Sequence, residues 1–87
     1  MSVVRVVVVR SGGFAGIERR AEVDDPDRAQ RLSAAVRASA QREADGRRRD
    51  GFVYEFTLVT TSDETRVDLP DTALDATLRT AVRALFR

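Results

Sequence analysis

The valine-rich segment 3–9 is the feature that most restricts how this chain can fold. All of its residues except Arg5 are valine, and branched β-carbons favour extended backbone and pack well on a pleated sheet. Ser11, Gly12 and Gly13 follow, and a Gly-Gly pair supplies the positive φ angles of a tight hairpin turn. The pattern predicts a buried first strand that turns directly into a second one.

A return strand is predicted over residues 14–23, where apolar and polar side chains alternate. With a two-residue Gly-Gly turn, Val8 lies opposite Ile17, and opposed residues share a face of the sheet. Arg19 then falls on the core face and has to extend its head group past a sheet edge. A three-residue turn would instead change the register and move Phe14 inward. The two-residue turn predicts a core face made of Val4, Val6, Val8, Ala15, Ile17 and Ala21.

A helix is predicted to begin in the acidic segment 24–27. Asp25 can cap it, and Pro26 suits the first helical position. Cation binding is the alternative for these carboxylates, but neither the oxygen-ligand spacing nor the loop glycine of a calcium site is present. The helix is expected to end near Gly46, before the charged loop 47–51. Its apolar stripe is Ala29, Leu32, Val36 and Ala40.

Two further strands are predicted in the second half of the chain. Segment 52–59 alternates strictly, so its aromatic side is expected to face the core. A turn over 60–64 leads to a strand over 65–69, with Val67 and Leu69 inward. The aromatic side of the third strand consists of Phe52, Tyr54, Phe56 and Leu58.

A second helix is predicted to open at Pro70. Thr72 and Asp75 can form a capping pair in its first turn, and Phe86 can close the end of the core. Its buried stripe is Leu74, Leu78, Val82 and Leu85. The chain therefore reads strand, strand, helix, twice in succession. This order predicts a single α+β domain over residues 1–87, with a four-stranded, mostly antiparallel sheet and two helices on one face.

The other face of such a sheet is left open. It is expected to carry Val3, Val7, Val9 and Phe14, with Val53 and Val59 from the third strand. This is more exposed aliphatic surface than a solitary protein usually leaves uncovered. The face is a candidate interaction surface, either for a different protein or for a second copy of the chain.

The chain contains no His and no Cys, which excludes most compact catalytic and metal-binding arrangements. The glycine-rich segment 11–16 leads into a strand rather than a helix, so it lacks the helix-terminal amides of a phosphate site. No apolar run approaches the roughly 20 residues that span a bilayer. These observations predict a cytoplasmic protein that is not an enzyme and has no cofactor, metal site or membrane partner.

Three segments carry a family resemblance: Ser-Gly-Gly-Phe-Ala-Gly-Ile at 11–17 after the valine-rich strand, the aromatic strand at 52–56, and the terminal helix that follows Pro70. Together they resemble the emfourin family, small protein inhibitors of thermolysin-like metallopeptidases that are associated with protealysin-type enzymes. The resemblance spans most of the chain in order and in length.

The resemblance implies an inhibitor of a zinc peptidase, with a thermolysin-like metallopeptidase as its partner. Thermolysin-like peptidases favour a bulky apolar residue just after the scissile bond, and Phe14 beside the glycine turn supplies one. The implied contact region is the first hairpin, namely Ser11, Gly12, Gly13, Phe14, Ala15 and Gly16.

Two other functions remain open. The chain can be a structural or regulatory homodimer that packs through the open sheet face, or a nucleic-acid-binding module that uses the basic run 47–49. The net charge of +1 argues against a nucleic-acid partner, and the aromatic residues of the third strand are needed in the core. In solution we expect a monomer or a weak homodimer.

Overall fold

The computed structural model describes residues 3–12, 18–42 and 52–86. Their elements are β1 (Arg5–Gly12), β2 (Arg19–Val23), α1 (Pro26–Arg42), β3 (Phe52–Val59), β4 (Glu64–Pro70), the 3₁₀ helix η1 (Asp71–Ala73) and α2 (Ala76–Leu85). The strand–strand–helix order therefore occurs twice, as predicted, with η1 added before the last helix.

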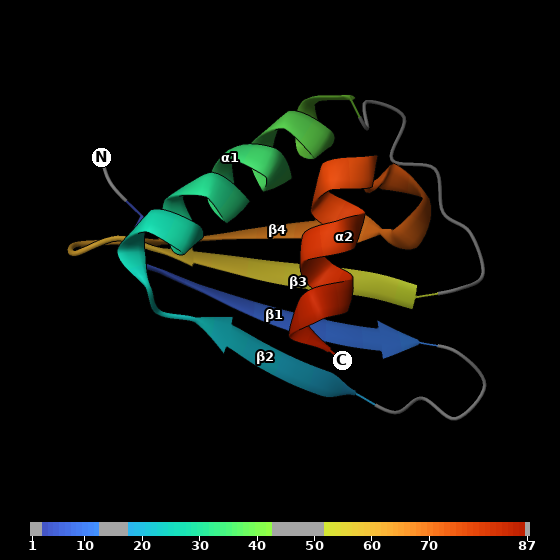
Figure 1. Ribbon diagram of the computed structural model, residues 1–87, viewed down its shortest axis with the longest axis horizontal. Coiled ribbons are helices and arrows are strands. Elements are labelled where there is room, and N and C mark those ends of the chain that lie inside the picture. Colours follow the sequence, from blue (N-terminus) through green and yellow to red (C-terminus); the bar gives the residue numbers. More distant parts are fainter. Residues whose placement is uncertain (1–2, 13–17, 43–51, 87) are drawn as a thin grey trace.

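The strands form an antiparallel sheet in the order β2-β1-β3-β4. Both α-helices lie on one face of this sheet (Figure 1), because side chains from α1 and α2 join the same core cluster. One covered face is the common arrangement for antiparallel strands in which apolar and polar residues alternate. The predicted α+β class, the four-stranded sheet and the two helices are confirmed.

The centre of the core lies between β1 and β3. Tyr54, Phe56 and Leu58 are each 6% exposed or less, which confirms that these residues of β3 face inward. The side chain of Phe52, predicted on the same side, lies outside what the structure describes. Val6 and Val8 of β1 are fully buried and lie opposite Leu58 and Phe56. Such branched and aromatic pairs across neighbouring strands are a main source of sheet stability.

The register of the first hairpin differs from the predicted one. Val8 lies opposite Ala21 rather than Ile17, so the two strands are displaced by four residues relative to a Gly-Gly turn. A displacement by an even number of residues leaves every side chain on its own face of the sheet. The predicted core side of these strands is therefore retained even though the predicted pairs are wrong.

Both strands of this hairpin also have different ends from those expected. β1 does not stop at Ser11 but continues through Gly12 along β3, whereas its last pair with β2 is Arg10 with Arg19. β2 begins at Arg19. The second turn glycine, Gly13, and the predicted first part of the return strand, with Ala15 and Ile17 on its core side, lie in 13–17, outside the described residues.

The residues before β1 depart from the predicted alternation. Val3, expected on the open face, is 3% exposed and joins the core, whereas Val4, expected in the core, is half-buried. Alternation is a property of regular strand, and β1 begins only at Arg5. Val3 is instead tied to α1, because its N–H donates a hydrogen bond to Oε1 of Gln30 at 2.8 Å.

The first helix begins where the sequence predicts. An Asp25 carboxylate oxygen accepts a hydrogen bond from the N–H of Asp27 at 3.3 Å, and the Asp25 carbonyl accepts one from Ala29 at 2.8 Å. This satisfies N–H groups that a helix N-terminus otherwise leaves unpaired. The apolar stripe is buried as expected except for Ala40, which is half-buried. The predicted end near Gly46 lies outside the described residues.

The strand β4 and the turn before it follow the prediction closely. The N–H of Thr60 donates to the carbonyl of Asp63 at 2.8 Å, and the Asp63 carboxylate accepts from the N–H of Glu64 at 2.9 Å. β4 is one residue longer than predicted at each end. Leu69 is buried and Val67 packs against the core, as expected.

The second helix begins later than predicted. Pro70 is the last residue of β4, and η1 follows it. The helix α2 starts at Ala76, capped by Asp75, whose carboxylate accepts a hydrogen bond from the N–H of Leu78 at 2.8 Å. The predicted capping pair with Thr72 is therefore wrong, because Leu74 is extended and interrupts the helical backbone before Asp75.

Leu78 and Leu85 allow a matched test of this core. Leu78 is fully buried, whereas Leu85 is half-buried on the same helix. Leu78→Ala is expected to lower the free energy of unfolding by about 2–5 kcal/mol, because it removes packed atoms and leaves a cavity. Leu85→Ala is expected to cost clearly less. Urea unfolding measures both, and equal losses would contradict the described packing.

Candidate partner-binding site

The first hairpin leaves the sheet beside the start of β3. Ser11 and Gly12 close β1, opposite Val53 and Phe52. Ser11 is half-buried. Gly12 has a φ of 114°, a conformation that glycine adopts without the steric penalty of a side chain. Among the predicted contact residues, these two are placed at the strand end, and the other four, Gly13, Phe14, Ala15 and Gly16, lie outside the described residues.

Arg10 and Arg19 mark the base of this hairpin, since they form the last pair between β1 and β2. Both guanidinium groups lie over the ring of Phe86, with Cζ 5.2 Å from the ring centroid for Arg10 and 5.9 Å for Arg19. Phe86 is the C-cap residue of α2. The end of the last helix therefore packs against the point from which the hairpin connection leaves the sheet.

Phe86 also connects this base to the core. Its ring centroid lies 6.5 Å from that of Tyr54, and the Tyr54 centroid lies 6.2 Å from that of Phe56. The sequence predicted an inward Arg19 and a core-closing Phe86, but not that the two would meet. A signal for this contact was present in the sequence. Arg19 is a long charged side chain on the inward side of a strand, and such a side chain packs its aliphatic part on an apolar surface. The neighbouring rings of Phe86, Tyr54 and Phe56 therefore connect the hairpin base to the buried core.

Neither a metal-binding cluster nor a membrane-spanning helix is present among the described residues. No group of His, Cys, Asp or Glu side chains among them could hold a metal ion. No helix in the described part of the chain is long and apolar enough to cross a membrane. What the described residues do provide is a hairpin whose base is packed against Phe86.

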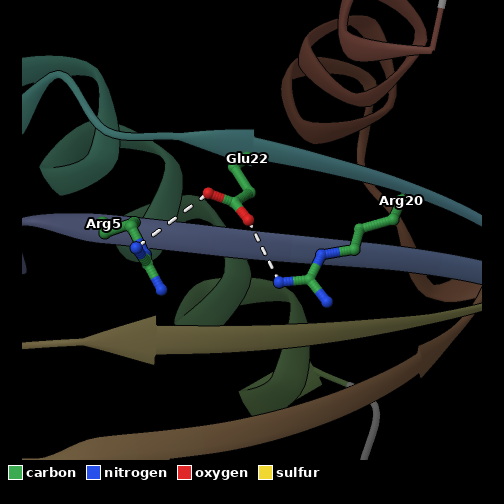
Figure 2. A network of polar contacts seen from close by, with 3 residues as sticks. All are labelled: Arg5, Arg20 and Glu22. Atoms are coloured by element: carbon green, nitrogen blue, oxygen red, sulfur yellow. Dashed lines mark hydrogen bonds and ion pairs between the residues drawn. The ribbon is translucent and has the colours of Figure 1, made fainter.

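Charged side chains occupy much of the open face of the sheet. Glu22 of β2 forms ion pairs with Arg20 on the same strand, at 3.0 Å, and with Arg5 on β1, at 4.0 Å (Figure 2). Glu22 lies opposite Val7, and Val7 is only 8% exposed. This valine was expected in an exposed aliphatic patch, and it is instead largely shielded from solvent.

The half of the open face formed by β3 and β4 also carries paired charges. Arg66 Nε on β4 lies 2.9 Å from Glu55 Oε2 on β3. Exposed ion pairs of this kind contribute roughly 0–1 kcal/mol, so their main effect is to keep the face polar. Val9, Val53 and Val59 remain half-buried there. The apolar part of the open face is smaller and more interrupted than expected.

The aromatic side of β3 does not form a base-stacking platform in the part of the chain that the structure describes. Tyr54 is 6% exposed and Phe56 is fully buried, whereas stacking on nucleic-acid bases needs accessible rings. The basic run 47–49 lies outside the described residues. The described geometry therefore gives no support to the nucleic-acid alternative.

The structure defines a class of protein: a small α+β protein with helices on one face of a four-stranded sheet and a braced hairpin base at one end. The Emfourin family model matches residues 8–85, and the chain belongs to this family. No curated protein and no solved structure gives a match. The resemblance noted in the sequence is confirmed, and membership implies a metallopeptidase inhibitor rather than an enzyme. The matched range includes all the predicted contact residues.

Phe86→Leu tests the bracing of the hairpin base. The substitution keeps an apolar side chain but removes the ring that both arginines contact. The two contacts together contribute about 1–2 kcal/mol, so amide exchange in 19–21 is expected to accelerate by roughly fivefold to thirtyfold without global unfolding. Hydrogen exchange followed by NMR measures this. Phe86→Tyr keeps a ring and serves as the control, and unchanged exchange in Phe86→Leu would contradict the bracing role.

Proposed function

We propose that this chain inhibits thermolysin-like, protealysin-type zinc metallopeptidases by placing its first hairpin in their active-site cleft. The family match over residues 8–85 carries the proposal, because the resemblance to the emfourins implies this class of target. The contact residues in the proposal are Ser11, Gly12, Gly13, Phe14, Ala15 and Gly16.

The braced base of the hairpin supports this function. The connection between Arg10 and Arg19 starts and ends on paired strands, and both arginines pack on Phe86. A loop with constrained ends has less conformational entropy to lose on binding than a free segment. Such preorganisation favours tight binding by a short contact region.

Phe14 and the glycines give the proposed contact its chemistry. The Phe14 side chain fills the apolar pocket that receives the residue after the scissile bond. Glycine at 12 and 13 allows the cleft walls to approach the inhibitor backbone closely. In this arrangement backbone carbonyl groups lie near the catalytic zinc or its water, and substrate is excluded because its place is occupied.

The proposed inhibition leaves the metal in the peptidase. The chain has no imidazole or thiolate with which to compete for zinc, since it contains neither His nor Cys. We expect the inhibited peptidase to retain its zinc when the complex is isolated and its metal content is measured. Loss of zinc on inhibition would contradict a mechanism based on occupation of the cleft.

A direct inhibition assay tests the function and the hairpin separately. The full chain is expected to inhibit a thermolysin-like peptidase. Phe14→Ala is expected to weaken binding by about 2 kcal/mol or about thirtyfold, as for a buried aromatic at the centre of an interface. Gly13→Val is expected to weaken it as well, because a branched side chain obstructs close approach. Inhibition constants and urea unfolding of each variant supply the measurements.

Arg37→Ala on the exposed surface of α1 is the matched control, since it is remote in the chain from the proposed contact residues. If both hairpin variants inhibit as strongly as the unsubstituted chain, the hairpin assignment is wrong while the inhibitor function stands. Failure of the unsubstituted chain against several thermolysin-like peptidases would overturn the function itself.

The homodimer through the open sheet face is the competing interpretation. The low exposure of Val7 and the ion pairs of Glu22 and Glu55 on that face make it less favourable, because association would have to desolvate these charges. Light scattering over a range of concentrations distinguishes the two interpretations. A dimer that persists on dilution would favour the homodimer.

The cytoplasmic location stays a prediction.

A further inference from the structure

A groove of about 280 Å³ lies between the two helices. Its walls come from α1 and α2, and Val23 at the end of β2 also lines it. β2 is an edge strand of the sheet, so the groove lies near the border of the covered face.

Small side chains account for the hollow. Ala35 on α1 and Ala81 and Ala84 on α2 line it, and larger residues at these positions would fill the space at the density usual for protein interiors. Leu85, predicted in the buried stripe of the last helix, is only half-buried and lines the groove together with Leu32. The groove is therefore a largely apolar surface open to solvent.

Two arginines complete the lining. Arg28 and Arg31 lie about one turn apart on α1, and both are exposed. Neither forms an ion pair with another residue that the structure describes. Thr77 is the remaining polar residue of the lining, which includes no carboxylate. The charge that faces the groove is consequently positive.

We propose that this groove binds a small amphipathic carboxylate. Its aliphatic chain lies between α1 and α2, and its carboxylate is held by Arg28 and Arg31. A planar guanidinium group binds a carboxylate through two parallel hydrogen bonds. The volume lies near the lower end of small-molecule sites, which span roughly 300–1,000 Å³, so the ligand is a single unbranched chain. The groove is formed by residues other than the proposed peptidase contacts.

Titration of the full chain with sodium decanoate, below its micelle-forming concentration, tests the proposal by NMR. Saturable shifts are expected at Leu32, Ala81 and Leu85. The double variant Arg28→Gln/Arg31→Gln is expected to bind about tenfold more weakly, because hydrogen bonds to charged groups are lost. Arg83→Gln changes an exposed arginine of α2 that does not line the groove, and it is expected to bind normally.

Two further measurements separate this site from nonspecific association. Decyltrimethylammonium has the same aliphatic chain with the opposite charge, and it is expected to cause no saturable shift in the groove. Ala81→Leu fills the apolar space and is expected to abolish decanoate binding while the chain stays folded. The proposal is overturned if decanoate gives no saturable shift, if its shifts fall on the open sheet face, if the cation binds equally well, or if either groove variant binds normally.

Discussion

The pairing of β1 with β3 is the contact on which the rest of the molecule depends. Val6 and Val8 face Leu58 and Phe56 across these two central strands, and all four side chains are buried. The outward side of the sheet carries polar residues such as Glu22, Glu55 and Thr57 around the β1 valines, so only the other face gains from being covered by helices. Both helices pack on that face, and this places the end of α2 near the base of the first hairpin. The braced hairpin is thus a consequence of one-sided burial in the sheet.

The predictions that succeeded rest on short-range patterns. Alternation identified the inward side of β3, and pairing with an alternating return strand identified that of β1. The Asp25 cap located the start of α1 because a cap acts within a few residues. The register of the first hairpin failed for a physical reason: displacement by four residues preserves every face, so the hydrophobic pattern is equally compatible with both registers. The predicted start of α2 was wrong because Asp71 to Ala73 form a separate 3₁₀ helix, and proline followed by an acidic residue is also typical of the start of an α-helix.

The candidate site also has one part that local sequence patterns predicted and another part that they did not. Glycine and a neighbouring phenylalanine identified the hairpin from local chemistry, together with the resemblance to the emfourins. The brace beneath it joins Arg10, Arg19 and Phe86, which come from three separate parts of the sequence. Their meeting depends on strand order and on the direction of the last helix, and no local pattern contains that information. The groove between the helices was missed for the same reason, since its alanines look like ordinary helix-forming residues.

The position of β2 has a consequence for aggregation. β1 is a run of valines in regular strand, a composition that readily pairs with other chains when its edge is exposed. In the sheet order β2-β1-β3-β4 it is central, and on one side its cover is the five-residue strand β2. β2 carries three charged residues, Arg19, Arg20 and Glu22, and charged edge strands resist edge-to-edge pairing. The short strand β2 therefore covers one edge of the aggregation-prone strand β1. Local opening at β2 would expose that edge and allow self-association.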